Sequence, residues 1–188
     1  FAASLLLAET GPMTRLMLVL ALLAVGCRAD INPSHPASGS IPTRIKLATW
    51  NLEWLIAPQA FRSLRGSCVP QGASPAGRQR YIPCDVVAGQ ERSTADFAAL
   101  ARYAQRLDAD VIALQEVDGE AAARLVFRGY QFCFSARTAL QNTGFAIRAG
   151  LPFRCGADFL QLSLHDSVRR GAELILFPGT ANEWRLLA

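Results

Sequence analysis

The sequence is poor in several residue types and patterns that would assign it to a common class. Lys46 is its only lysine, and His35 and His165 are its only histidines. Its five cysteines show no Cys-x-x-Cys spacing, which argues against a zinc site. No internal repeat, low-complexity tract or collagen-like period is present, so repeat and fibrous architectures are excluded. A chain of 188 residues, 51% of them hydrophobic, is instead long enough for one globular domain with a core.

With lysine nearly absent, arginine supplies almost all of the positive charge, and the net charge is +4. Arginine makes forked contacts to phosphate, so this bias suits a phosphate-bearing partner. A GC-rich coding sequence would give the same bias, and many soluble proteins carry a similar net charge. The charge alone therefore identifies no partner.

The N-terminal apolar run is shorter than the roughly 20 residues that a membrane-spanning helix needs. This run covers residues 16–26 and follows a short basic start at Met13. A basic start, an apolar stretch and a small residue before Cys27 are typical of an export signal. We therefore assign residues 1–12 to sequence upstream of the start and residues 13–27 to a signal peptide.

Residues 24–27, AVGC, resemble a bacterial lipobox, and this resemblance implies that Cys27 is lipidated after cleavage. The alternative is ordinary signal cleavage beside an incidental cysteine. Residues 28–43 are rich in Pro, Ser and Gly, which indicates a flexible tether to a domain of residues 44–188. The protein is therefore expected to be exported, as a periplasmic protein, a membrane-anchored lipoprotein or a secreted protein.

Export allows disulfides to form among the four remaining cysteines, Cys68, Cys84, Cys133 and Cys155. Four cysteines allow three connectivities. Cys68 and Cys84 lie in one irregular segment, where a bridge would reduce the entropy that opposes order. Cys133 lies in a strand-like run and Cys155 just beyond the next one, which favours a second bridge. The alternative is four buried free thiols.

The pattern along residues 44–188 predicts alternating strands and helices, followed by a run of strands. Residues 44–50 alternate as a first strand, and Ser93 begins a capping-box sequence that starts a helix ending near residue 107. Residues 55–92 lack periodicity, with room for two short helical turns. Further elements are expected as a strand at 108–114, a helix at 119–126 and strands at 130–134, 144–148, 159–165, 172–177 and 184–188. This order predicts an α/β fold with a mixed sheet and helices on its outer face.

Two motifs carry the chemistry: residues 48–54, ATWNLEW, and residues 109–117, ADVIALQEV. They place Asn51 and Glu116 at the carboxyl ends of two strands, 65 positions apart (116 − 51). Ligands of α/β sheets bind outside these ends, so neighbouring strands would bring both side chains to one crevice. A carboxylate there suits Mg²⁺, which takes one or two protein oxygens together with waters and substrate phosphate. Asn51 can donate to a phosphate oxygen or orient a metal-bound water without adding negative charge, and the alternative is that it only caps a turn.

These two motifs resemble the first two signature motifs of the endonuclease/exonuclease/phosphatase family, which has the fold of pancreatic DNase I. The resemblance covers residues 45–188 and implies a partial four-layer α/β/β/α sandwich. It also implies that Glu116 is the principal metal ligand and that Asn51 is an active-site residue near metal and phosphate. Asn51 and Glu116 are therefore the candidate catalytic residues and the candidate metal-binding residues. Gln115 precedes the glutamate in the family pattern as well, and is expected to support the site.

Residues 142–147, NTGFAI, resemble the family segment that enters a central strand beside the substrate. Asn142 is accordingly a candidate phosphate contact, with a turn role as the alternative. Glu53 is expected to be a loop residue behind the site, and Asp118 a cap for the following helix. His165 matches no family motif and is not expected to be catalytic.

The resemblance implies a Mg²⁺-dependent hydrolase of phosphodiester or phosphomonoester bonds, with Mn²⁺ or Ca²⁺ as alternative ions. Nucleic acid is the favoured substrate class, phospholipid head groups are the alternative, and a monomer is expected. The family's later histidine, Gly-Asp-Phe-Asn and Asp-His motifs do not occur before Ala188, so this chain is expected to be an inactive fragment. A non-catalytic, truncated binding domain remains the second hypothesis.

Overall fold

The computed structural model describes residues 42–73, 80–89, 91–162 and 170–188. Contacts along the chain separate a unit of Phe1–Gly39 from a unit of Ser40–Ala188, and all described residues belong to the second unit. The predicted signal peptide, Cys27 and His165 lie outside the described residues, as does the predicted tether except residues 42–43. Within the described part, no helix combines the length and apolar character needed to cross a bilayer.

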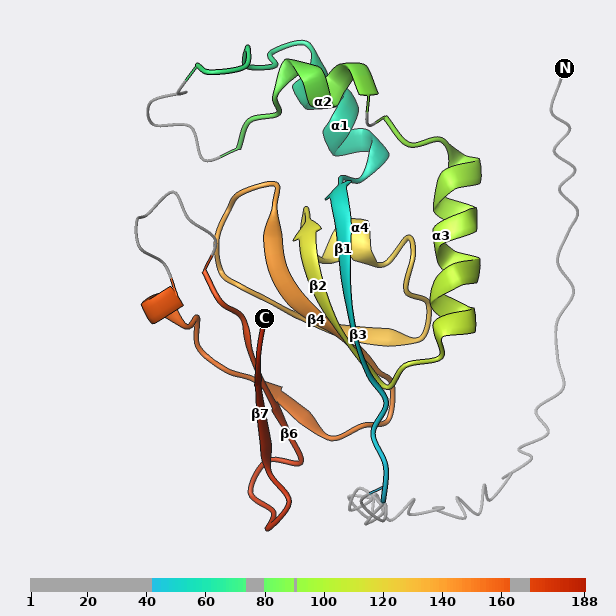
Figure 1. Cartoon of the computed structure of the whole chain (residues 1–188), viewed down its shortest axis with the longest axis vertical. Helices are drawn as coiled ribbons and strands as arrows, with labels where there is room; N and C mark the ends of the chain where they lie inside the picture. Colours follow the sequence, from blue (N-terminus) through green and yellow to red (C-terminus); the bar gives the residue numbers. More distant parts are fainter. Residues whose placement is uncertain (1–41, 74–79, 90, 163–169) are drawn as a thin grey trace, which may run out of the picture. The chain divides into compact units, whose positions relative to one another are not determined.

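The described part of the second unit is a mixed α/β structure with a four-stranded and a three-stranded sheet (Figure 1). The first sheet has the spatial order β1-β2-β4-β3, with β1 parallel to β2 and the other neighbours antiparallel. Its strands are β1 (Leu47–Leu55), β2 (Val111–Val117), β3 (Tyr130–Phe134) and β4 (Asn142–Arg148). The second sheet is antiparallel and contains β5 (Phe153–Cys155), β6 (Glu173–Leu176) and β7 (Trp184–Leu187). The helices are α1 (Pro58–Arg65), α2 (Cys84–Gly89), α3 (Thr94–Leu107), α4 (Glu120–Ala123) and the 3₁₀ turn η1 (Leu160–Leu162).

The helix α3 provides the crossover that a parallel pair such as β1 and β2 requires. Its predicted capping box is confirmed, since Ser93 Oγ accepts from the N–H of Asp96 and the Asp96 carboxylate accepts from the N–H of Ser93. Satisfying these backbone donors fixes the first turn of the helix. The chain therefore enters α3 at a defined angle directly after Arg92.

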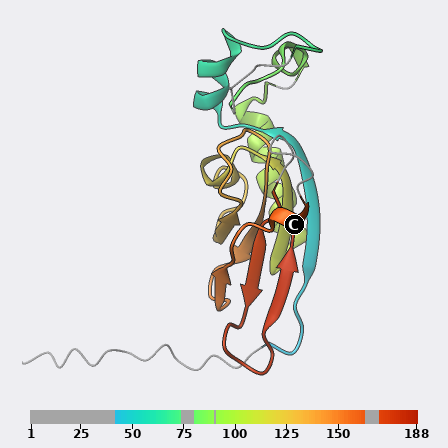
Figure 2. The same ribbon diagram turned by 90° about the vertical axis from the view of Figure 1, so that its left-hand side faces the viewer.

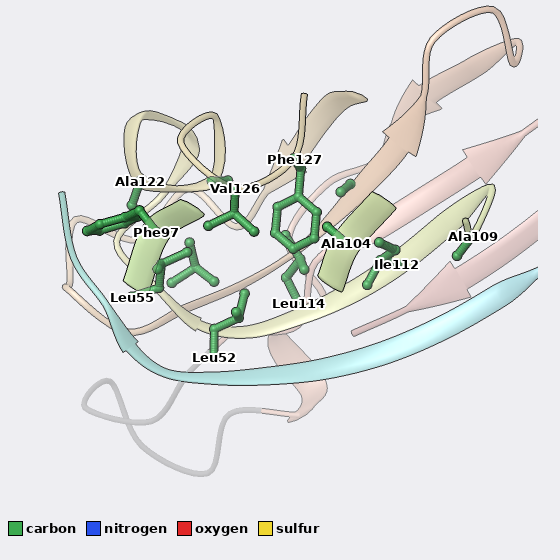
Figure 3. Packing of buried hydrophobic residues seen from close by; sticks show 13 residues of the cluster. Leu52, Leu55, Phe97, Ala104, Ala109, Ile112, Leu114, Ala122, Val126 and Phe127 are labelled. Carbon is green, nitrogen blue, oxygen red and sulfur yellow. The ribbon is translucent and has the colours of Figure 1, made fainter. Parts of the chain in front are cut away.

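The first sheet buries apolar side chains on both faces. On one face α3 and the segment around α4 cover β1 and β2, and the labelled side chains of Figure 3 point toward one another there. This cluster includes Leu52, Leu55, Phe97, Ala104, Ile112, Leu114, Val117, Val126 and Phe127. On the other face Phe145 and Ile147 of β4 pack against Leu174 and Leu176 of β6. The result is a helix layer, a sheet and a second sheet. In Figure 2 the red strands of the second sheet, β6 and β7, face the viewer.

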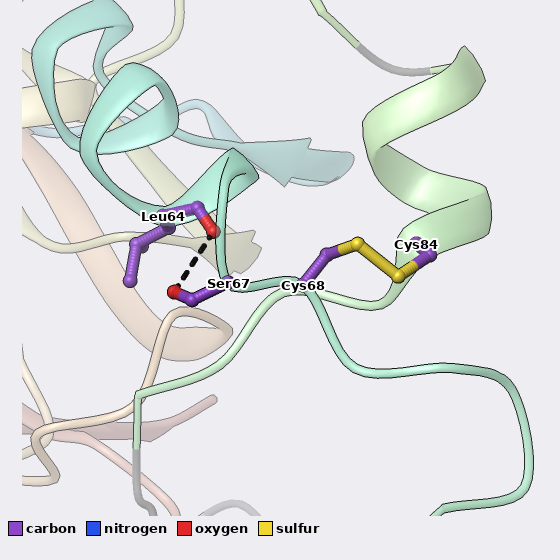
Figure 4. Close-up of a disulfide and its surroundings, with 4 residues drawn as sticks. All are labelled: Leu64, Ser67, Cys68 and Cys84. Atoms are coloured by element: carbon purple, nitrogen blue, oxygen red, sulfur yellow. Dashed lines mark hydrogen bonds between the residues drawn. A yellow bond between two sulfur atoms is a disulfide. The ribbon is translucent and has the colours of Figure 1, made fainter.

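The irregular segment after β1 contains the two short helices that the sequence allowed, α1 and α2. They lie together beyond the end of β1 (Figure 1), around a small core that includes Ile56, Phe61, Ile82 and Leu140. The Cys68–Cys84 disulfide joins the chain after α1 to the start of α2, and Ser67 Oγ donates to the carbonyl of Leu64 beside it (Figure 4). This segment is therefore folded and cross-linked.

The second disulfide, Cys133–Cys155, joins β3 of the first sheet to β5 of the second. Both bridges are pairings that the sequence analysis considered among the three open connectivities. A cross-link between the sheets supplements the apolar packing between them, because it restricts the unfolded chain.

The secondary structure differs from the prediction in several places. The strand expected at 159–165 is reduced to one bridge between Phe159 and Gly171, followed by the 3₁₀ turn η1, while residues 163–169 lie outside the described part. The strand β5 was not predicted, because Phe153–Cys155 is too short to show alternation. The helix expected at 119–126 is confirmed only as the single turn α4.

Candidate functional site

The carboxyl ends of β1 and β2 are irregular at the same level of the sheet. The two strands pair regularly up to Asn51 and Gln115, and pairing resumes at Leu55 and Val117. Three residues of β1 therefore lie opposite one residue of β2, Glu116. The antiparallel β2–β4 pair is irregular over the same stretch of β2. Such bulges re-aim side chains and are frequent beside active sites.

The bulges also account for the spacing of the buried side chains. Leu52 and Leu55 belong to the core on the helix side of the sheet, and so do Leu114 and Val117. In a regular strand successive side chains face opposite sides, so residues three apart cannot share a face. The irregularity returns Leu55 and Val117 to the core and leaves Glu116 half-buried at the strand end.

Backbone strain is concentrated in these bulges. Glu53, Trp54 and Glu116 have φ angles of 44°, 57° and 62°. The other non-glycine residues with positive φ in the described part are Asp108 and Phe177. Each such residue costs on the order of 1–3 kcal/mol, and this kind of strain clusters at functional sites. Three strained residues at the carboxyl ends of β1 and β2 therefore make these strand ends a candidate site.

Asn51 has a turn role in the structure. Its Oδ1 accepts a hydrogen bond from the N–H of Glu53 at 2.9 Å, which is the reach of an Asx turn. The side chain is exposed, and Oδ1 is engaged, so Nδ2 is the atom that can donate to a ligand. The prediction that β1 ends at Asn51 is wrong, because the strand continues to Leu55; the regular pairing with β2 is what ends there.

Two glutamines hold the β2 side of the site. Gln141, directly before β4, donates from Nε2 to Oε2 of Glu116 at 3.0 Å. Gln115 donates from Nε2 to Oγ1 of Thr49 at 3.1 Å, which ties β2 to β1 just before the bulges. Gln141 is a neutral donor, so its hydrogen bond orients the Glu116 carboxylate without neutralising the negative charge.

The backbone of the β1 bulge is held by Arg92. Its guanidinium donates to the carbonyls of Leu52, Glu53 and Trp54. Partial burial lowers the pKa of Arg92, while the nearby carboxylates of Glu53 and Asp96 oppose this shift. Periodicity did not single out Arg92 or Gln141, because neither belongs to a periodic run. Arg92 was notable only as one of five arginines in residues 55–92, which suit a phosphate-bearing substrate, and as the residue before the capping box.

Asp118 does not cap the next helix, and that prediction is wrong. Gly119 is the N-cap of α4, without a side-chain cap. Asp118 instead forms a forked ion pair with Arg80, at 2.8 Å and 3.1 Å, and its side chain is only 5% exposed. Burial raises the pKa of Asp118, and the contact with Arg80 acts in the opposite direction. The pair joins the segment before α2 to the end of β2.

Asn142 shows the turn role that was the alternative for it. The residue is buried, and its Nδ2 donates to the carbonyl of Ala139 at 2.6 Å. Its Oδ1 is buried without a hydrogen-bond partner. Asn142 pairs with Val117 in the sheet and so lies next to Glu116 in the fold, and one of the two donors of its amide nitrogen is engaged with Ala139.

Two cavities flank Arg92 on the helix side of β1. One, of about 620 Å³, is lined by Trp50, Tyr103 and Arg106 among others, and one, of about 310 Å³, by Phe61 and Arg62 among others. Neither is lined by Asn51 or Glu116.

No group of three or more acidic, histidine or cysteine side chains that could hold a metal occurs in the part of the chain that the structure describes. A site on Asn51 and Glu116 would thus supply one carboxylate, that of Glu116, since Oδ1 of Asn51 already accepts from the N–H of Glu53. Such a donor set fits a hard ion that keeps several waters, as Mg²⁺ does, and does not fit a fully protein-enclosed ion.

The sequence matches no family model and no curated protein.

Proposed function

We propose that the ends of β1 and β2 form the metal-dependent site of a phosphoester hydrolase of the endonuclease/exonuclease/phosphatase type. The fold would be the DNase I-like sandwich, of which the described helix layer and two sheets would be part. Nucleic acid is the favoured substrate class. The observation that supports this proposal is the coincidence of two strained bulges beside Asn51 and Glu116, on neighbouring parallel strands.

Glu116 would hold the ion, since it lies in the bulge of β2, opposite residues Leu52–Trp54 of the β1 bulge. Magnesium at this position would polarise a phosphoryl oxygen and screen negative charge during displacement. Gln141 fixes one carboxylate oxygen of Glu116 by hydrogen bonding. Asn51 would use Nδ2 to donate to a phosphate oxygen, because its Oδ1 is engaged with the N–H of Glu53.

Metal binding by the full chain, with its disulfides oxidised, tests this site most directly. Mn²⁺ is the probe, because the loss of its free-ion EPR signal reports binding. We expect wild type to bind one Mn²⁺ and Glu116→Gln to bind it at least about tenfold more weakly, since the charged ligand is lost. Glu120→Gln is the matched control, because Glu120 is an exposed carboxylate on α4 that pairs with Arg124.

Equal affinities of wild type and Glu116→Gln would contradict the proposal, as would no binding by wild type. Turnover is a separate question. Glu116 and Asn51 cannot both activate water and stabilise the developing charge, so we expect this chain to hydrolyse a generic phosphodiester no faster than background. Mg²⁺-dependent turnover that Glu116→Ala abolishes would overturn that expectation and support the site.

A further inference from the structure

Arg92 makes an unusual set of contacts for a half-buried arginine. Its Nη1 lies 2.9 Å from the carbonyl oxygen of Trp54, and its Nη2 lies 2.7 Å from that of Leu52 and 2.9 Å from that of Glu53. Three consecutive carbonyls therefore converge on one guanidinium. A planar fork of fixed donors suits such a cluster, whereas an ammonium group presents its donors from one point.

The three carbonyls belong to the part of β1 that cannot pair with β2. Glu53 and Trp54 both have positive φ, so their carbonyls are turned out of the sheet's regular hydrogen bonding. Backbone carbonyls that lose sheet partners need other donors, because leaving them unsatisfied is costly. Arg92 supplies these donors and so offsets the strain of the bulge.

Arg92 is itself held in place by α3. It directly precedes the N-cap residue Ser93, whose capping box with Asp96 fixes the start of the 14-residue helix. That helix packs onto the sheet through Phe97 and Ala104. The guanidinium is therefore carried by a rigid element that is separate in sequence from the bulge it contacts.

The same bulge orients Asn51. The N–H of Glu53 donates to Asn51 Oδ1, while the carbonyl of Glu53 accepts from Arg92. The Asn51 amide is thus connected to α3 through a single residue. If Glu53 moved, Asn51 would lose the hydrogen bond that fixes its side-chain rotamer. Its Nδ2 would then no longer point in a fixed direction.

We propose that Arg92 is a positioning residue for the candidate site: it holds the carbonyls of Leu52–Trp54, which lie opposite Glu116 where β1 and β2 lose their regular pairing, and so keeps Asn51 and Glu116 in a productive arrangement. This inference rests on the proposed function, because it assigns Arg92 to the same site. It goes beyond the two motifs, since Arg92 lies outside both. Supporting residues of this kind typically change metal affinity by about 10–100-fold when they are removed.

The test compares Arg92→Ala with Arg148→Ala in the full chain with intact disulfides. Arg148 also contacts a backbone carbonyl, that of Ala109, and pairs with Asp108 and Asp110, but at the opposite end of β2. It therefore controls for the general loss of a structural arginine. Urea denaturation shows whether each variant is folded under the binding conditions, and Mn²⁺ affinity is then measured by EPR. Amide hydrogen exchange of Glu53 is followed by NMR.

We expect Arg92→Ala to weaken Mn²⁺ binding by about tenfold or more and to speed exchange at Glu53, with neither change in Arg148→Ala. Wild-type affinity in a folded Arg92→Ala variant would overturn the inference, even if exchange at Glu53 became faster. A wild type that binds no Mn²⁺ would instead contradict the proposed function. In that case, faster amide exchange of Glu53 in Arg92→Ala than in wild type would still show that Arg92 holds the Asn51 turn, and an unchanged rate would show that it does not.

Discussion

Gln141 donates a hydrogen bond from Nε2 to Oε2 of Glu116 at 3.0 Å, across 25 positions of sequence. Gln141 directly follows Leu140, which packs with Ile56 and Phe61 in the small core around α1 and α2. The disulfide-linked segment and the candidate metal ligand are therefore joined through two consecutive residues. This contact gives the α1–α2 segment a structural connection to the site.

Replacing Gln141 should weaken metal binding without changing the charge of the site. We expect Gln141→Ala to reduce Mn²⁺ affinity by about tenfold, because a partner that orients the ligand is lost. The measurement is the same EPR titration. Gln131→Ala is the matched control, since Gln131 is exposed on β3 and far along the sheet from Glu116. Equal losses in the two variants would show that the contact with Glu116 has no special role.

The Asp118–Arg80 pair predicts a pH dependence of stability. Burial raises the pKa of Asp118, so the folded state binds this proton more tightly than the unfolded state does. Such a group favours folding below its unfolded pKa, near ~4, and this contribution is lost as the pH rises through the folded pKa. The free energy of unfolding of wild type, relative to Asp118→Asn, should therefore fall as the pH rises from about 3 to about 7.

Urea denaturation at several pH values measures this difference. Asp85→Asn is the control for loss of one carboxylate, because Asp85 is exposed on α2. A difference between wild type and Asp118→Asn that grows with pH would show that the ion pair with Arg80 outweighs burial, and that the direction assigned here is wrong.

Local signals in the sequence predicted a large part of the fold. The capping box at Ser93 fixes the start of α3 by hydrogen bonds within four residues, so it can be recognised without any tertiary information. The strand expected at 130–134 coincides with β3. The two motifs also do lie on neighbouring parallel strands, which follows from the helix that connects them.

The site's geometry could not be predicted in the same way. The bulges at Glu53 and Glu116 depend on the register between strands that are far apart in sequence, and alternation within one strand does not reveal register. Arg92 lies in no periodic run, and its three acceptors belong to a segment 38 to 40 positions away. Asp118 stands where a helix cap is expected, just before α4, but its ion pair with the distant residue Arg80 determines where its carboxylate lies.

Gly144 belongs to residues 142–147, the segment that resembles a family segment beside the substrate. Packing of the sheet, rather than a substrate contact, explains why this position is glycine. A Cβ at this position would lie 2.4 Å from Cδ1 of Phe134 and 2.6 Å from the carbonyl oxygen of Cys133. The neighbouring strand β3 thus approaches β4 so closely that only glycine fits, opposite Phe134 and Leu114 in the two ladders. The glycine allows this spacing next to the bulge that contains Glu116.

We therefore expect Gly144→Ala to lower the free energy of unfolding by about 1–3 kcal/mol, the usual cost of overfilling a packed site. Gly66→Ala is the matched control, because Gly66 ends α1 with φ −71° and a Cβ there meets no atom within 4 Å. That substitution should be neutral or stabilise the protein by up to about 1 kcal/mol, since alanine restricts the unfolded chain. Urea denaturation of both variants provides the comparison. Equal stabilities would mean that β3 can move away from β4 at little cost, and that the close approach at Gly144 does not hold the sheet beside Glu116.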